Sequence, residues 1–260
     1  MSAPPVHVLG ASIFCTMDQP ALASPASRFL IGGLPPEALP RAELVPTRMR
    51  RGTSVLCRLF VDVSAALGPV VALGEARLVF GSAWGEVMTA LALLEMRHGA
   101  DGNLSPARFK NSVHNAAAGL VSIACANREP STAIAAGGDT FAMCLLEAMG
   151  WLAESDRPVI VAVAEESPPS LFAPGIAHPP FAAALVLARS SQGRASLGTL
   201  GMVRRLPGAQ RAELPAALAR CPAARILPLL DALATSTAGT IVLGDGDAPF
   251  GADVAFSGQS

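Results

Sequence analysis

The chain has 260 residues, of which 51% are apolar and 15% charged. This composition supports a sizeable buried core and excludes a disordered chain. Lys and Arg number 19 against 20 Asp and Glu, giving a formal net charge of −1. Nucleic-acid binding requires a strongly basic surface, so this charge balance predicts no nucleic-acid partner.

The mean hydropathy of +0.45 raises the question of a membrane span. A span needs about 20 consecutive apolar residues, and the two longest candidates fail because 167–188 is rich in proline and 226–243 contains Asp231. No Lys or Arg precedes Arg28, and the apolar stretch at 8–14 is too short for a signal peptide. We therefore expect no membrane span and a cytoplasmic location.

The cysteines and histidines argue against disulfides and metals. The five cysteines are an odd number without a CxxC pair, and the four histidines lack HxxxH or HExxH spacing. We accordingly predict reduced thiols, no metal and no cofactor.

Strand and helix patterns alternate along the first half of the chain. Short apolar runs are typical of strands, whereas apolar residues at a spacing of three and four are typical of helices. In chain order we predict a strand over 6–10, a proline-rich connection over 18–47, a helix over 51–67, a strand over 76–82 and a helix over 85–98.

The alternation continues in the second half. We predict a helix over 113–126, a strand over 131–136, a tight turn over 137–139, a helix over 140–154, strands over 158–164 and 181–187, a helix over 224–234 and a strand over 239–243. The run at 158–164 is apolar throughout, as in a strand buried on both faces, and 181–187 could be its antiparallel neighbour. This alternation indicates an α/β fold, and no repeat or low-complexity linker divides it.

The turn at 137–139 is a candidate functional site. A sharp turn from a strand into a helix presents backbone N–H groups and the positive end of the helix dipole, and many α/β enzymes place a nucleophile there. Here the turn carries Gly137 and Gly138, which suit strained backbone angles but supply no nucleophile. A plain turn capped by Asp139 or Thr140 explains the pattern as well as an anion site does.

The segment around this turn resembles the β-ketoacyl synthases. Asn115-Ala-Ala-Ala-Gly119, followed by Pro130-Ser131 and a strand of small residues up to Gly138, is similar to the family's path from an Asn-x-x-x-Gly helix through Gly-Pro-Ser to the acyl-accepting cysteine. The flanking segments match in order and type, so the resemblance covers about residues 5–190. It implies an α/β fold equivalent to the N-terminal half of a thiolase-like protein, with a mixed central sheet and flanking helices. The resemblance further implies a single domain over 1–260, in which a divergent segment over 190–260 packs on the part that resembles the family.

Two departures from the family point to a silent subunit. Gly138 occupies the position of the nucleophilic cysteine, and the histidine contexts His-Gly-Thr and Asn-x-Phe-Gly are absent, since His178 is followed by two prolines. In these respects the chain is similar to the short ketosynthase-like chain length factors of aryl polyene biosynthesis. The resemblance implies a subunit with no catalytic residues that pairs with a complete β-ketoacyl synthase as a heterodimer.

The resemblance also implies a role in fatty-acid or polyketide-type biosynthesis. Such a subunit shapes the channel in which an acyl or polyene chain is elongated, and it meets the acyl carrier protein through the complex. The family pairs the strand at 131–136 across a two-fold axis and places the channel beside the helix at 113–126. The implied channel or interface residues are Phe109, Val113, His114, Asn115, Ser131, Ala133, Ala135, Thr140 and Phe141. For each of them the alternative is ordinary packing or capping.

Two other functions stay open at this point. One is a stand-alone acyl-thioester enzyme, an acyltransferase or hydrolase, that uses Cys125 or a serine with His114. The sequence around Cys125 imitates that of a ketosynthase nucleophile, but Cys125 ends a helical pattern instead of opening one, and no Gly-x-Ser-x-Gly elbow occurs. The other is a non-catalytic acyl-chain carrier or homodimeric binding protein.

Overall fold

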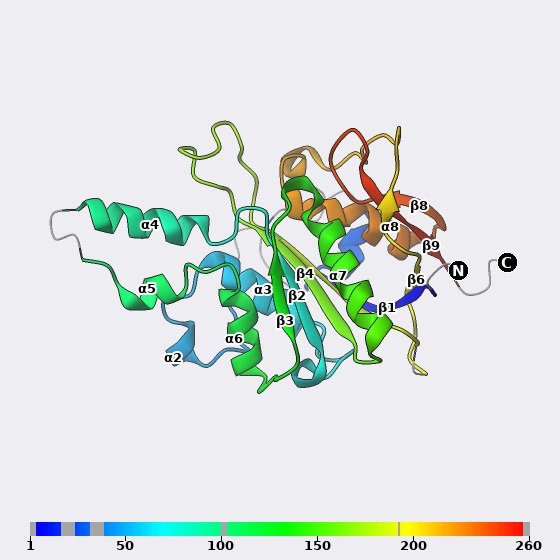
Figure 1. Cartoon of the computed structure of the whole chain (residues 1–260), viewed down its shortest axis with the longest axis horizontal. Coiled ribbons are helices and arrows are strands. Elements are labelled where there is room, and N and C mark those ends of the chain that lie inside the picture. Colours follow the sequence, from blue (N-terminus) through cyan, green and yellow to red (C-terminus); the bar gives the residue numbers. More distant parts are fainter. Residues whose placement is uncertain (1–3, 17–23, 32–38, 100–102, 192, 257–260) are drawn as a thin grey trace.

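A mixed sheet with helices on both faces organises the chain (Figure 1). The computed structural model describes residues 4–16, 24–31, 39–99, 103–191 and 193–256. Within them the strand order is β3-β2-β4-β5-β1-β6-β9-β7, and β8 pairs with β9. The strands are β1 (Val6–Cys15), β2 (Arg77–Gly81), β3 (Ser131–Ile134), β4 (Val159–Glu165), β5 (Phe181–Ala188), β6 (Gly198–Leu200), β7 (Arg204–Arg205), β8 (Gly239–Val242) and β9 (Phe250–Ala255).

Strand direction changes across the sheet. Strands β2, β3 and β4 are parallel, whereas β5 runs antiparallel to both β4 and β1. The predicted antiparallel neighbour of the apolar strand is therefore confirmed.

The described helices are α2 (Thr47–Arg50), α3 (Val55–Ala65), α4 (Val87–His98), α5 (Pro106–Lys110), α6 (Ala116–Ala124), α7 (Thr140–Glu154) and α8 (Leu227–Thr235), with 3₁₀ turns η1 (Pro25–Phe29), η2 (Leu73–Glu75), η3 (Gly137–Asp139), η4 (Ala216–Leu218) and η5 (Pro222–Ile226).

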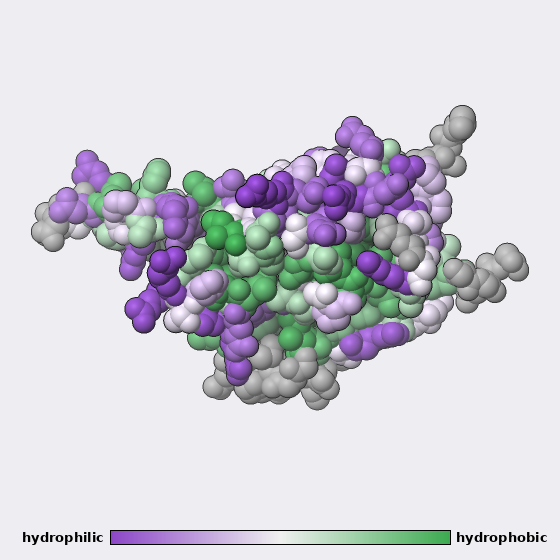
Figure 2. Space-filling model, turned by 90° about the horizontal axis from the view of Figure 1, so that it is seen from below, coloured by the Kyte–Doolittle hydropathy of each residue, from purple (hydrophilic) through white to green (hydrophobic). Residues whose placement is uncertain are grey.

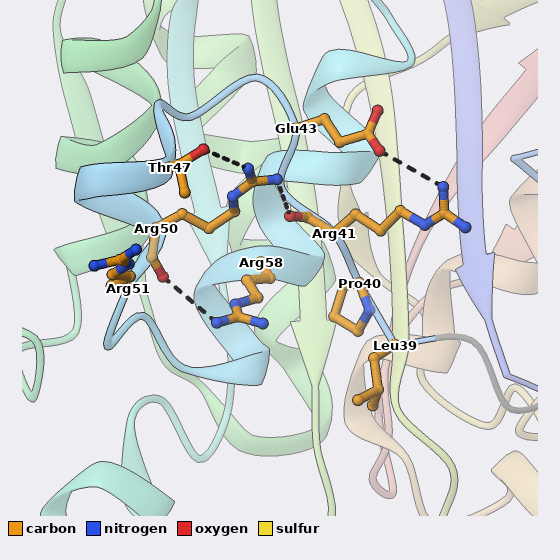
Figure 3. Close-up of a pocket in the computed structure, with 8 residues that line it drawn as sticks. All are labelled: Leu39, Pro40, Arg41, Glu43, Thr47, Arg50, Arg51 and Arg58. Carbon is orange, nitrogen blue, oxygen red and sulfur yellow. Dashed lines mark hydrogen bonds and ion pairs between the residues drawn. The ribbon is translucent and has the colours of Figure 1, made fainter.

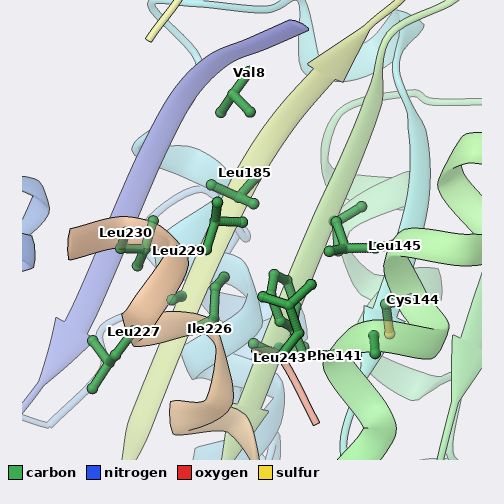
Figure 4. Packing of buried hydrophobic residues seen from close by; sticks show 14 of the residues in the cluster. Val8, Phe141, Cys144, Leu145, Leu185, Ile226, Leu227, Leu229, Leu230 and Leu243 are labelled. Atoms are coloured by element: carbon green, nitrogen blue, oxygen red, sulfur yellow. The ribbon is translucent and has the colours of Figure 1, made fainter. Parts of the chain in front are cut away.

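The two faces of the sheet have separate apolar cores. Alternate side chains of β4 and β5 point to opposite faces, so Val161 and Leu185 pack beneath α7 and α8 while Ala162 and Val186 pack with α3 and α6. Every residue of both strands is buried, which explains why both runs are apolar up to Glu165 at the end of β4. Figure 4 shows Phe141 of α7 among the side chains of the first core.

Most predicted elements are present, with shifted ends. The helix at 140–154 is confirmed at both ends. The helix predicted from residue 51 begins only at Val55. It begins there because the Ser54 hydroxyl caps it by accepting a hydrogen bond from the Cys57 N–H at 2.9 Å. The first strand extends to Cys15 past an irregularity between Val8 and Gly10. The predicted connection over 18–47 contains η1, and its parts at 18–23 and 32–38 lie outside the described residues.

The segment after residue 190 joins the same sheet. Strand β6 pairs with β1, β9 pairs with β6, and α8 packs on the core shared with α7. The sequence patterns did not predict β6, β7 or β9, because each is short or lacks a clear alternation of apolar residues. The segment thus extends the sheet at the edge opposite β3.

Helices α4 and α5 project from the body as an arm (Figure 1). Leu93 is the only buried residue of α4, although that helix is largely apolar. Leu94 and Phe109 are exposed on this arm. Across the described residues, no helix is long and apolar enough to cross a bilayer.

Candidate functional site

The turn between β3 and α7 has the predicted strand–turn–helix geometry. Gly137 adopts a left-handed backbone with φ of +57°, and the Thr140 hydroxyl closes the turn. This hydroxyl accepts a hydrogen bond from the Ala136 N–H at 3.0 Å and donates one to the Gly137 carbonyl at 2.8 Å. Thr140 is therefore occupied with holding the turn.

The space above Gly138 is already filled by Asp245, which follows β8. A Cβ atom built at position 138 would overlap the Cβ of Asp245 and lie 3.0 Å from its Oδ2. Asp139 is at the N-cap position of α7, one of the two residues considered as a cap, but its side chain makes no capping hydrogen bond. It instead accepts a hydrogen bond from the Asp245 N–H at 3.0 Å. Position 138 thus carries no nucleophile, and a side chain added there would require Asp245 to move.

A cleft of about 670 Å³ lies over this turn. Three arginines line it, together with Trp84 and Ile176. The Asp245 Oδ1 is 2.7 Å from Nε of Arg211 and 3.5 Å from Nη2 of Arg225. Cys221 also lines the cleft, but burial raises the pKa of its thiol, which disfavours a thiolate.

Two buried carboxyl groups, those of Glu86 and Glu165, and the half-buried carboxyl group of Glu166 lie near the same end of the sheet. Burial raises the pKa values of Glu165 and Glu166 to about 7, and the charge on Glu86 adds to the shift of Glu166. The Glu165 carboxylate accepts a hydrogen bond from the Ser82 hydroxyl at 3.0 Å, while a carboxylate oxygen of Glu86 accepts one from the Ser54 hydroxyl at 2.6 Å. These contacts hold the segment between β2 and α4, so the cluster positions the base of the arm.

Sequence reasoning did not single out this cluster. The pair Glu165-Glu166 directly follows an apolar strand, and that abrupt change from apolar to acidic residues was the available signal. Oε1 of Glu166 is buried and has no hydrogen-bond partner among the described residues.

The structure does not bring Cys125 and His114 together. Cys125 follows the last residue of α6 and His114 precedes its first, so the nine residues of the helix separate them by about 14 Å along its axis. Burial also raises the pKa of the Cys125 thiol. The imidazole of His114 packs against Gly85, where an added Cβ atom would lie 2.5 Å from its Nδ1. Among the described residues no serine hydroxyl is hydrogen-bonded to this ring, so the geometry offers no dyad.

The nine channel or interface candidates divide by exposure. Phe109 and Val113 are 62% and 45% exposed, and Asn115, Ser131 and Ala135 are also exposed. His114 and Ala133 are half-buried, whereas Thr140 and Phe141 are buried. Phe141 has no exposed surface and belongs to the core between the sheet and α8.

Strand β3 forms one edge of the described sheet and pairs only with β2. A free edge presents unpaired N–H and C=O groups that can bind another strand. Beside it, Ile123 on α6 is 66% exposed, and further exposed apolar residues lie on the arm. Figure 2 shows apolar side chains on the arm and over the middle of the face seen from below. The β3 side, meaning the free edge of β3 with the exposed apolar residues of α6 and the arm, is a candidate protein interface.

Basic side chains gather around α2 and the start of α3. Figure 3 shows four arginines and one carboxylate, Glu43, around a pocket of about 590 Å³. Arg51 also borders a groove of about 550 Å³ between α5 and α6, whose apolar wall includes Leu120 and Ile123. The cations of the two pockets are Arg41, Arg48, Arg50, Arg51, Arg58, Arg108 and Lys110. The local surface is therefore electropositive although the whole chain is not.

The chain matches the family described as "Beta-ketoacyl synthase, N-terminal domain" over residues 32–242, which is most of its length. It therefore belongs to the β-ketoacyl synthase family. The match starts later than the predicted resemblance, at residue 32, and it extends past residue 190 into the segment that was predicted to be divergent. A comparison with curated proteins gave no match.

Solved structures show the same fold. One chain of the ketosynthase ApeO in complex with its chain length factor ApeC from Xenorhabdus doucetiae has a TM-score of 0.72 at 20% identity, and the match covers 96% of this chain and 100% of that one. The ishigamide ketosynthase/chain length factor gives 0.70 at 15% identity, with coverage of 97% and 99%. A β-ketoacyl synthase from Burkholderia phymatum STM815 gives 0.61 at 14% identity, with coverage of 90% and 71%. The predicted mixed α/β fold with flanking helices is confirmed.

Proposed function

We propose that this chain is a non-catalytic ketosynthase-like subunit, a chain length factor, that pairs with an active β-ketoacyl synthase. The observation that carries the proposal is the occupied nucleophile position, where Gly138 lies against Asp245. A family member without a nucleophile cannot accept an acyl group at this turn, so the partner must supply the cysteine and both histidines. The similarity to structures of ketosynthases with their chain length factors supports the same assignment.

The β3 side of the molecule fits the pairing surface. The free edge of β3 can extend a partner's sheet, and Ala133 and Ala135 are small enough to allow close approach. Ala133 pairs with Phe80, whose ring lies in the core with α3 and α6, so its side chain is on the α6 side. Ala135 lies just beyond the strand and is exposed. Ala135 is the better position at which to probe the partner.

The growing acyl or polyene chain would contact exposed residues of this subunit. Phe109 and Val113 offer large apolar side chains that the other described residues leave largely exposed. Phe109 lies on α5, and Val113 lies in the segment that joins α5 to α6. Phe141 is enclosed by its own core. We therefore place the subunit's contribution to the channel wall at Phe109 and Val113.

An acyl carrier protein is the expected third component. Carrier proteins are acidic, and the electropositive surface around Arg51 and Lys110 is complementary to an acidic partner. The structure of a type II polyketide ketosynthase, AntDE, with the carrier protein AntF has a TM-score of 0.70 to this chain at 10% identity, covering 97% and 99% of the two chains. The basic surface adjoins the proposed pairing side, so one carrier protein could reach both subunits.

Co-purification with a complete ketosynthase encoded beside this chain tests the proposal. We expect a 1:1 complex, and we expect Ile123→Glu and Ala135→Arg to weaken it at least about tenfold, because an unpaired charge buried in an interface costs several kcal/mol. Met202→Glu is the matched control, since Met202 is an exposed apolar residue that follows β6, away from the β3 edge.

Measurements on the isolated variants distinguish loss of the interface from loss of the fold. All three variants must show the wild-type circular dichroism spectrum and unfolding midpoint when measured alone. A complex that survives Ile123→Glu and Ala135→Arg at the wild-type affinity would exclude the β3 side as the pairing surface, and absence of any complex would contradict the proposed function.

A further inference from the structure

The cleft over Gly138 contains charged groups that the proposed function does not use. Arg211, Arg220 and Arg225 line a volume of about 670 Å³, which is within the range of small-molecule sites. Among the described residues that line the cleft, Asp245 is the only carboxylate. The described lining therefore carries an excess of positive charge.

Arg225 is the most constrained of these cations. It is 8% exposed, its Nη1 donates to the Ala212 carbonyl at 3.3 Å, and its Nη2 is 3.5 Å from the Asp245 carboxylate. A guanidinium has five N–H donors, and a buried one requires an anion at closer range to offset its desolvation. The contact with Asp245 is long for a charge-assisted hydrogen bond.

The loop that carries Asp245 is built to a narrow geometry. Gly244 passes so close to Asp139 that a Cβ atom at position 244 would overlap the Asp139 carboxylate, and Gly246 has a φ of +147°. In this conformation Asp245 lies above Gly138, and its Oδ1 faces Arg211 and Arg225.

The remaining walls select for an apolar ligand body. Trp84, Ile176 and Pro222 lie on the same cleft as the arginines. A ligand with one anionic end and a short apolar body could place its charge at Arg211 and Arg225 and its body along these side chains. A bare inorganic oxyanion would leave these apolar walls in contact with water.

We propose that this cleft binds a small organic carboxylate with an apolar body, whose carboxylate displaces that of Asp245 from Arg211 and Arg225. Asp245 then acts as an internal competitor that holds the arginines when the ligand is absent. This site lies on this chain alone and does not depend on the proposed pairing with a ketosynthase.

Isothermal titration calorimetry on the full chain tests the inference, with hexanoate as the probe. Hexanamide has the same body without the charge, and inorganic phosphate has the charge without the body. We expect saturable binding of hexanoate, and at least about tenfold weaker binding of hexanamide and of phosphate, the factor expected for loss of one charge-assisted interaction.

Three variants distinguish binding of hexanoate in the cleft from nonspecific binding to positively charged side chains. Asp245→Asn keeps the shape but removes the competing charge, so we expect hexanoate to bind more tightly, by about tenfold. Arg211→Gln should weaken binding by a similar factor. The exposed Arg97 lies at the end of α4, and Arg97→Gln should leave binding unchanged.

Several results would overturn the inference. They are the absence of saturable hexanoate binding to both the wild type and Asp245→Asn, equal binding of hexanamide, equal binding of phosphate, or equal effects of Arg211→Gln and Arg97→Gln. Because none of these measurements uses a ketosynthase, a failure here leaves the pairing experiment to be judged on its own result.

Discussion

Replacing Gly138 by alanine perturbs the contact on which the silent-subunit assignment rests. The added methyl group would overlap the Cβ of Asp245, so the Asp245 loop must move. Overpacking of this kind costs about 1–3 kcal/mol, and movement of Asp245 also weakens its interaction with the buried Arg225. We expect Gly138→Ala to lower the free energy of unfolding by about 2–4 kcal/mol. The unfolding midpoint would fall by about 2–4 °C for each kcal/mol.

A double-mutant cycle in urea isolates this contact. Asp245→Gly removes the overlapping Cβ atom, whereas Asp245→Ala retains it, so only the glycine variant should relieve the clash. We predict a coupling free energy of about 1–3 kcal/mol between Gly138→Ala and Asp245→Gly, and a clearly smaller one with Asp245→Ala.

Two outcomes would refute this reasoning. The first is a Gly138→Ala variant whose unfolding free energy is within about 0.5 kcal/mol of the wild type, which is the range of an ordinary surface substitution. The second is equal coupling to the glycine and alanine variants of Asp245, which would show that the Cβ contact is not the cause of the destabilisation.

Three further predictions follow from burial and charge. Phe141→Ala should lower the free energy of unfolding by about 3–5 kcal/mol, because it leaves a cavity in the core. Phe172→Ala, at a half-exposed loop residue, should change this free energy by less than about 1 kcal/mol. Equal effects of the two variants in urea unfolding would contradict the placement of Phe141 in the core. Burial raises the pKa of Glu166 from 4.5 to about 7, so between these pH values the folded chain holds a proton that the unfolded chain has released. The free energy of unfolding should therefore fall as pH rises through this window, by up to about 1.4 kcal/mol per pH unit. Glu166→Gln should make this pH dependence less steep, and an unchanged pH dependence of thermal unfolding would show that Glu166 does not cause it. Arg51→Gln combined with Lys110→Gln should weaken carrier-protein binding to the complex and reduce its salt dependence, and an unchanged salt titration would remove this surface from the docking site.

The central strand–turn–helix unit could be predicted from sequence because its signals are local. The small-residue strand at 131–134, the two glycines and the amphipathic helix at 140–154 are contiguous, and each has its own pattern. The same holds for β4, whose continuous apolar run reflects burial on both faces. Strands β6, β7 and β9 could not be predicted, because they are two to six residues long and are defined by partners distant in the chain.

The contact that decides the site is also nonlocal. Asp139 and Asp245 are 106 residues apart, and nothing near Gly138 in the sequence shows that Asp245 covers it. The sequence likewise could not distinguish whether Phe141 lines a channel or lies in the interior of the core. Exposure separates Phe109 from Phe141, and exposure depends on the complete fold.

Intact-protein mass spectrometry of the complex tests the central claim most directly. The purified pair of this chain and its ketosynthase would be incubated with an acyl-loaded carrier protein, and each subunit would be weighed after denaturation. The account predicts an acyl adduct on the ketosynthase subunit and an unmodified mass for this chain, both in the wild type and in a Cys125→Ala variant. A stable acyl adduct on this chain that is lost in Cys125→Ala would contradict the account.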